Sequence, residues 1–77
     1  MNDNIVSRDF YLSAYLTAVG IELKNHSKDG NITNFEFENT PQVHEEMKKY
    51  YSMKAVVNPV AFGNCLKNLK SIIHASA

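Results

Sequence analysis

Four side chains in this 77-residue sequence could hold a metal ion or act as a nucleophile and base: Cys65, His26, His44 and His74. Metal sites usually bring their ligands in close pairs, such as Cys-x₂-Cys or His-x₃-His. None of the four residues is paired in that way. A single cysteine on the apolar side of a helix is more often a small buried residue than a reactive thiol. We therefore expect neither a metal site nor a cofactor.

The sequence also lacks the residue patterns that identify common catalytic sites. It contains no glycine-rich phosphate loop and no serine, histidine and aspartate set with the order and context of a triad. The adjacent carboxylates Glu45 and Glu46 fit the solvated side of a helix. We therefore expect a non-enzymatic domain with no small-molecule substrate.

One row of residues could instead bind a charged partner. Gly63, Lys67, Lys70 and His74 are spaced four, three and four residues apart, which places them along one side of a helix. Glycine inside a helix costs about 1 kcal/mol relative to alanine and often marks a close backbone approach. Such a row could follow a phosphate backbone or an acidic partner. The alternative is a solvated flank with Gly63 packed beneath another element.

Lys48 and Lys49, followed by Tyr50 and Tyr51, could extend this basic row, because aromatic rings stack on the bases of single strands. The net charge of the chain is zero, but residues 44–77 carry five cations and two anions, whereas residues 1–43 carry three and six. Dedicated nucleic-acid binders usually have strongly basic domains. Nucleic-acid binding through a basic face of the C-terminal half is therefore our second hypothesis.

Our first hypothesis is a protein-interaction or regulatory module. The first expected helix has apolar residues on most of its sides, so it is either wedged between other elements or partly exposed to a partner. One of its sides, if exposed, would suit a protein partner or a second copy of this chain in a homodimer. The alternative is that the expected hairpin covers this side. The residues of this candidate partner-binding side are Phe10, Tyr11, Ala14 and Ala18.

The first helix is expected to begin at Ser7 or Asp9 and to end near Val19, before Gly20. Apolar and polar residues then alternate over 21–26, which predicts a strand with one solvated face. A turn follows at residues 27–31, and a second strand places Phe35 and Phe37 inward.

Two later helices begin with the same signal, a capping side chain followed by proline. Thr40 precedes a helix that ends near Tyr51, and Asn58 precedes a helix that reaches Ile73. Residues 54–57 could form a third strand or an extended connector. The last helix carries the longest apolar stripe, so we expect it to be the largest block of the core and the element on which the others pack. The stripe consists of Phe62, Cys65, Leu66, Leu69, Ile72 and Ile73.

The resulting order is helix, strand, strand, helix, optional strand, helix, which predicts a small α+β domain with helices packed on an antiparallel hairpin sheet. A chain of this length makes one domain, here residues 1–77, with residues 1–6 and 75–77 expected to be frayed. No apolar run is long enough to cross a membrane, and no secretory signal is visible. With one cysteine and no possible internal disulfide, we expect a cytoplasmic location.

Four groups of residues form a recognisable pattern: residues 7–16 with Gly20, Phe35-Glu36-Phe37, residues 57–62 and Leu69-Lys70-Ser71. This pattern, which spans Ser7 to Ile73, resembles a family of small bacterial and phage proteins known only as a domain of unknown function. The resemblance implies a bacterial or phage origin and supplies no activity or cofactor. This chain lacks the glycine expected of the family near Ser52, so the turn before Lys54 is expected to differ.

Overall fold

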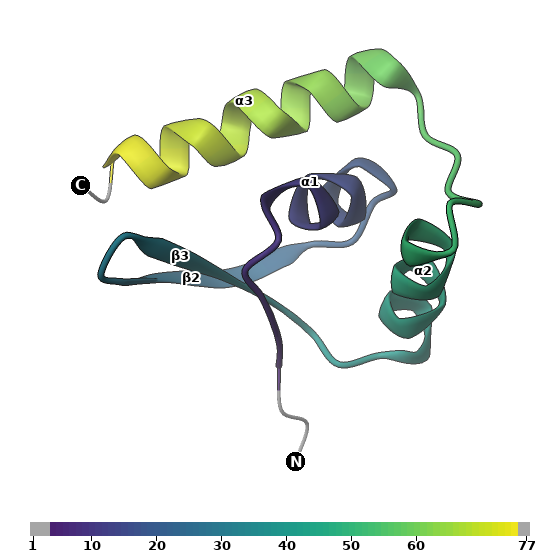
Figure 1. The fold of residues 1–77 in the computed structure, drawn as a ribbon, viewed down its shortest axis with the longest axis horizontal. Helices are drawn as coiled ribbons and strands as arrows, with labels where there is room; N and C mark the ends of the chain where they lie inside the picture. Colours follow the sequence, from purple (N-terminus) through teal and green to yellow (C-terminus); the bar gives the residue numbers. More distant parts are fainter. Residues whose placement is uncertain (1–3, 76–77) are drawn as a thin grey trace.

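Helix α1 (Phe10–Ala18) lies at the centre of the molecule (Figure 1). The structure, a computed structural model, describes residues 4–75. Helix α3 (Pro59–Ala75) crosses above α1, helix α2 (Pro41–Tyr51) lies to one side, and the sheet lies below. Strand β1 (Ile5–Ser7), α2 and α3 all contact α1. The fold is therefore α+β, as the sequence predicts, with α1 wedged between the other elements.

Within residues 4–75, the sheet has three antiparallel strands in the order β1-β3-β2. Strands β2 (Leu23–Asp29) and β3 (Ile32–Phe37) form the predicted hairpin, although β2 begins and ends later than the predicted 21–26. The turn is confined to Gly30 and Asn31, and Gly30 has a φ of 64°, a left-handed conformation that glycine adopts without strain. Phe35 and Phe37 point inward and are almost fully buried, as predicted.

The N-terminal ends of α2 and α3 form as their start signals predict. The Thr40 hydroxyl accepts a hydrogen bond from the Val43 backbone N–H at 3.2 Å. The Asn58 side-chain oxygen accepts from the backbone N–H groups of Val60 at 2.9 Å and Ala61 at 3.1 Å. These bonds satisfy N–H groups that have no partner within the first turn of a helix.

The core is built mainly on α1, so the prediction that the last helix forms its largest block is wrong. Leu69 is the one fully buried residue of α3 among those that the structure describes, and the rest of its apolar stripe is half-buried. The reason is geometric, since α3 packs mainly across α1, which leaves the sides of its stripe partly open. The buried residues of α1 are Leu12, Ser13, Ala14, Tyr15 and Leu16.

Residues near both ends of the described chain are ordered where residues 1–6 and 75–77 were expected to be frayed. Ile5 and Val6 are not frayed, because β1 pairs with β3 in a register that places Ile5 opposite Phe37. The frayed ends predicted at residues 1–3 and 76–77 lie outside the described residues, and Ala75 is the last residue of α3.

Residues 54–57 form no strand, so the extended-connector alternative is the one observed. The third strand comes from the N-terminus.

Candidate functional site

The four residues predicted as a partner-binding side of α1 do not form one exposed surface. Ala14 is completely buried, whereas Tyr11 is 57% exposed, and Phe10 and Ala18 lie between these extremes. A side chain with no exposed area cannot touch a partner. This side of α1 is therefore mainly packing surface, with Tyr11 at its rim.

Tyrosine rings instead join the two helices α1 and α2. The ring centroids of Tyr15 and Tyr50 are 5.6 Å apart, and those of Tyr50 and Tyr51 are 5.3 Å apart in an edge-on arrangement. The Tyr51 hydroxyl donates a hydrogen bond to the Asp9 carboxylate at 3.3 Å. Partial burial, followed by the negative charge of Asp9, raises the pKa of both Tyr50 and Tyr51. Both shifts favour the neutral hydroxyl, which in Tyr51 is the donor to Asp9.

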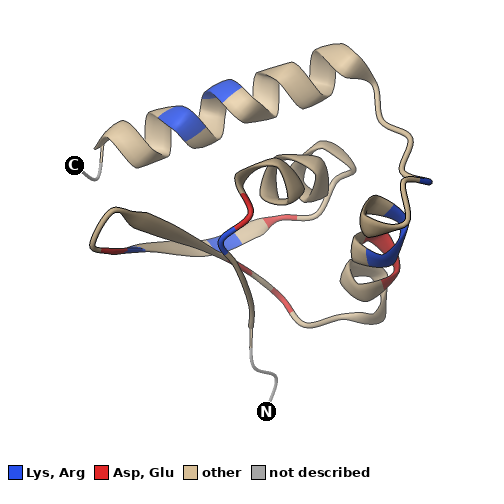
Figure 2. Ribbon diagram, viewed as in Figure 1, with Lys and Arg blue, Asp and Glu red and all other residues tan. Residues whose placement is uncertain are grey.

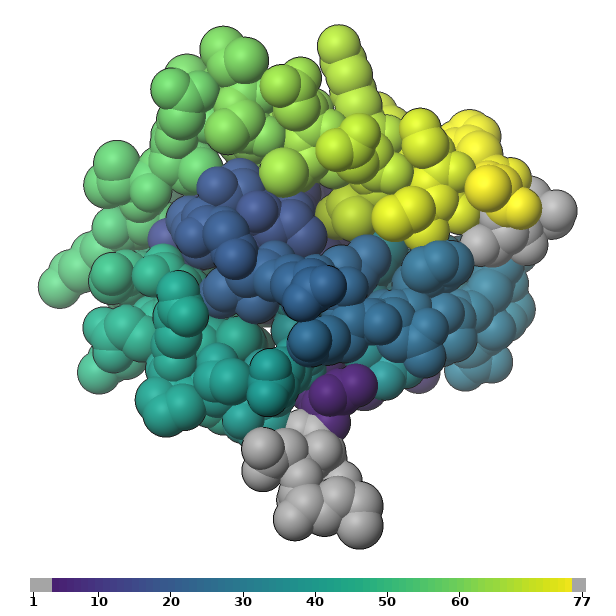
Figure 3. Space-filling model, turned by 180° about the vertical axis from the view of Figure 1, so that it is seen from behind, coloured from purple at the N-terminus to yellow at the C-terminus, as the bar shows by residue number. Residues whose placement is uncertain are grey.

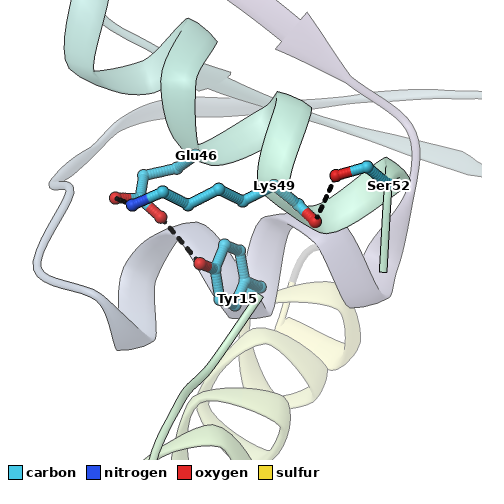
Figure 4. Close-up of polar contacts among 4 residues, drawn as sticks. All are labelled: Tyr15, Glu46, Lys49 and Ser52. Atoms are coloured by element: carbon cyan, nitrogen blue, oxygen red, sulfur yellow. Dashed lines mark hydrogen bonds and ion pairs between the residues drawn. The ribbon is translucent and has the colours of Figure 1, made fainter. Parts of the chain in front are cut away.

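Tyr15 makes the shortest polar contact between α1 and α2 (Figure 4). Its hydroxyl donates to a Glu46 carboxylate oxygen at 2.6 Å, and the other Glu46 oxygen lies 3.6 Å from the Lys49 ammonium nitrogen. Burial, then the hydrogen bond and charge of Glu46, raise the pKa of Tyr15 to about 12. Because Tyr15 is only 2% exposed, no substrate can reach its ring. The contact between Tyr15 and Glu46 therefore positions α1 against α2. Lys49 is engaged in the same contact.

Helix α2 ends in a turn that normally uses glycine. Met53 has a φ of 62°, the left-handed conformation that favours glycine. Its backbone N–H donates to the Tyr50 carbonyl at 3.1 Å, and the Lys54 N–H donates to the Lys49 carbonyl at 2.9 Å. The Ser52 hydroxyl caps the Lys48 carbonyl at 2.8 Å. The turn thus keeps a glycine-type backbone although this chain has no glycine there, at a cost of about 1–2 kcal/mol.

Three apolar side chains on and beside this turn are strongly exposed. Met53 is 93% exposed, Val56 is 86% exposed and Val60 is 70% exposed. Ala55 and Val57, which alternate with them, are partly buried against the core. Residues 53–58, here called the connector, form an outer edge of the molecule between α2 and α3 (Figure 3). We call Met53, Val56 and Val60 the connector surface.

A hollow of about 370 Å³ lies at the end of α2, beside the start of the connector. Its lining includes the side chains of Lys48 and Lys54. Within residues 4–75, neither of these lysines forms an ion pair, whereas Lys49 pairs with Glu46. Lysines of α2 and of the connector lie at the same edge of the molecule (Figure 2). The complete lining is Glu45, Lys48, Lys49, Ser52 and Lys54.

The predicted basic row on α3 is exposed at Lys67, Lys70 and His74. The lysines of α3 lie in its C-terminal half, well away from those of α2, so Lys48 and Lys49 do not continue the row (Figure 2). A side chain built onto Gly63 would meet no atom of a neighbouring element within 4 Å. The alternative in which Gly63 packs beneath another element is therefore wrong.

The four candidate ligands and nucleophiles are dispersed over the fold. Cys65 is half-buried, and His44 lies 2.7 Å from the Asn39 side-chain oxygen at the start of α2. Over the described range, residues 4–75, no three histidine, cysteine or acidic side chains gather in a way that could hold a metal ion. The expectation of no cofactor stays a prediction.

The sequence interpretation missed the connector surface. Periodicity detects helices and strands, and the connector has neither period. The available signal was local: Met53 and Val56 are apolar residues in a short aperiodic stretch between a helix end and Pro59. Such a stretch has few ways to bury both side chains.

The chain belongs to the family described as a domain of unknown function, DUF5659, whose sequence pattern matches residues 2–75. The predicted resemblance to a family of unknown function is thereby confirmed, while the bacterial or phage origin stays a prediction. No curated protein and no solved structure matches the chain. Along residues 4–75, none of the helices has the length and apolar character needed to cross a membrane.

Proposed function

We propose that this member of the family is a non-enzymatic protein-binding module and that the connector surface is its contact site. The observation that supports the proposal is the exposure of Met53, Val56 and Val60. Isolated exposed apolar residues are common, whereas several strongly exposed ones within one short stretch of chain suit an interaction site. This contact site differs from the one predicted on α1, where the buried Ala14 cannot reach a partner.

The partner is either a different protein or a second copy of this chain. A domain of this size buries a limited fraction of its surface, and association adds to its stability. We also infer a cytoplasmic location and a bacterial or phage origin, on the basis of the single Cys65 and the family resemblance. Neither inference is needed for the binding proposal.

The test compares three forms of the full chain that differ in exposed apolar residues. The first is wild type, the second carries Met53→Gly and Val56→Ser, and the third carries Val6→Ser as a matched control. Val6 is a 55% exposed valine on β1, where it pairs with Glu36 of β3 and not with the connector. Each protein is checked by circular dichroism, measured by light scattering at high concentration, and used as bait in a nuclease-treated host lysate.

We expect a partner, or a dimer, that wild type and the Val6→Ser variant share and that the connector variant loses. Binding that is equal in all three proteins would remove the connector surface as the contact site. A monomer that retains nothing from the lysate in any form would remove the binding function itself.

Nucleic-acid binding is the second candidate, and the exposed row on α3 is the observation that favours it. Lys67 and Lys70 are solvent-exposed and, in the part of the chain that the structure describes, have no ion-pair partner. If the row follows a phosphate backbone, changing both lysines to alanine should weaken binding to DNA or RNA and flatten its salt dependence. No detectable binding of the wild type at low salt would end this candidate.

A further inference from the structure

The end of α2 combines three features that point to a particular kind of partner. These are the strained turn at Met53, the connector surface and the hollow beside it, which is lined by three lysines (Lys48, Lys49 and Lys54) against one carboxylate, Glu45. We infer that the connector surface and this hollow together bind a segment of another protein in which carboxylates stand next to large apolar side chains. This inference rests on the proposed function and names the chemistry of its partner.

Met53 is a large side chain at a backbone position that favours glycine. Glycine would adopt the left-handed conformation at Met53 without steric cost, and the methionine there is almost fully exposed. It therefore loses stability relative to glycine and gains no burial within the domain. Strained residues of this kind occur preferentially at binding sites. Methionine also suits such a site, because its flexible, polarisable side chain adapts to different apolar partners.

Lys48 and Lys54 are not needed to cap the end of α2. Cations near the end of a helix often serve to cap its last carbonyl groups. Here the carbonyls of Lys48, Lys49 and Tyr50 already accept hydrogen bonds from the Ser52 hydroxyl and from the backbone N–H groups of the turn. The ammonium groups of Lys48 and Lys54 are not engaged in capping or in ion pairs within residues 4–75. They are available to a carboxylate from outside.

Unpaired cations and exposed apolar side chains lie close together in the sequence at this end of α2. The adjacency of Met53 and Lys54 in the chain places a cation next to the connector surface. A partner that offers carboxylates alone would leave the apolar side chains in water, and an apolar partner would leave the lysines unpaired. A phosphate backbone likewise satisfies the cations but does not cover Val56 and Val60. An acidic and apolar protein segment satisfies both parts of the site.

The experiment selects ligands without assuming a sequence. A phage-displayed library of random 12-residue peptides is panned on the intact wild-type chain, and the selected peptides are synthesised and titrated by fluorescence anisotropy. We expect selected sequences that place Asp or Glu beside Leu, Phe, Met or Trp. Titrations are repeated with two site variants and one control, each checked for folding. The variants are Lys48→Gln with Lys54→Gln, Met53→Gly with Val56→Ser, and the control Lys67→Gln with Lys70→Gln.

We expect the double variant Lys48→Gln with Lys54→Gln to bind the peptide about fivefold more weakly, because exposed ion pairs contribute modestly to affinity. Its binding should also depend less on salt than that of wild type. The Met53 and Val56 pair should weaken it about tenfold or more. The control pair on α3 should change it less than about twofold.

Different failures separate this inference from the proposed function. Neutral apolar peptides that depend on Val56 but not on Lys48 or Lys54 would overturn the acidic partner and leave the binding function intact. Peptides that no variant affects, or no enriched peptide at all, would overturn both. Binding of a single-stranded oligonucleotide that requires Lys48 and Lys54, without peptide enrichment, would assign the lysines to nucleic acid and overturn the inference.

Discussion

The C-terminal ends of α1 and α2 use the same hydrogen-bond pattern with different side chains. At the end of α1, the Gly20 N–H donates to the Thr17 carbonyl at 3.1 Å, and the Ile21 N–H donates to the Leu16 carbonyl at 3.0 Å. At the end of α2, Met53 and the residue after it make the corresponding two bonds. In both turns the chain passes through a left-handed residue and then leaves the helix.

The two ends differ in what these positions contribute to folding. Gly20 adopts its φ of 98° without a Cβ clash, and Ile21 is buried at the core, close in sequence to the buried Leu16. Met53 and Lys54 occupy the same two positions on α2, and both are exposed. The first end therefore follows the rules for stability. The end of α2 has a non-glycine residue, Met53, in the left-handed conformation and an exposed residue, Lys54, after it. Stability alone therefore does not explain these two residues.

The residue that follows the left-handed position is Ile21 in α1's turn and Lys54 in α2's turn. Exchanging these two residues should give the largest difference in the free energy of unfolding. Ile21→Lys places an ammonium group at a buried site and removes an apolar side chain, so we expect a loss of about 2–4 kcal/mol in the free energy of unfolding. The reciprocal change, Lys54→Ile, should stay within about 0.5 kcal/mol because the site is exposed. Urea denaturation of both variants measures the difference. Equal effects would mean that the two helix ends are equivalent.

Exchanging the left-handed residues themselves, Gly20 and Met53, should change the free energy of unfolding by a smaller amount and in opposite directions. Gly20→Met should cost about 1–2 kcal/mol, since the new Cβ is strained at that φ. Met53→Gly should stabilise the domain by about 1 kcal/mol, because it removes the same kind of strain and no buried contact is lost. Thermal unfolding followed by circular dichroism detects both shifts. A destabilised Met53→Gly variant would show that the methionine packs within the domain, against the binding proposal.

Gly63 is a third position at which another residue should make the domain more stable, because the backbone conformation there accepts a side chain. Open space lies around a side chain built there, and its φ is not in the left-handed region. Gly63→Ala should therefore stabilise α3 by up to about 1 kcal/mol. The expected readout is a higher thermal midpoint with unchanged oligomeric state. A variant with a lower midpoint would contradict the open space seen in the structure.

The contact that holds α2 against α1 should have no pH dependence near neutrality and a measurable one in alkali. The pKa of Tyr15 is raised from 10.0 to about 12 in the folded chain, so folding favours its neutral form. This contribution is complete below pH 10 and is lost as the pH rises from 10 towards 12. Thermal midpoints recorded across that range should fall less steeply in Tyr15→Phe than in wild type. Parallel curves would remove Tyr15 as the source.

The sequence predicted those parts of the fold that carry periodic or capping signals. The start of α2 at Thr40, the start of α3 at Asn58 and the inward Phe35 all follow from such signals. The strand at Ile5 was missed because three residues are too short for a period to emerge, and its pairing with Phe37 is non-local. Which helix is central also depends on the packing of whole elements, which no local pattern encodes.

For the candidate site, the sequence placed the exposed lysines correctly but not their grouping. Spacing showed that Lys67 and Lys70 share one side of a helix, and both are exposed. Spacing could not show that Lys48 lies at a different edge of the molecule, together with Lys54. The burial of Ala14 likewise depends on which elements cover α1.

The position of β3 in the middle of the sheet has a consequence for the order in which the chain assembles. The β2–β3 hairpin closes through a turn of two residues, a local event that takes microseconds. The pairing of Ile5 with Phe37 must wait for β3 and then closes a long loop that contains α1. During synthesis, α1 therefore emerges before α2 and α3, the two helices that pack on it, and its apolar sides remain accessible to chaperones until the second half of the chain arrives.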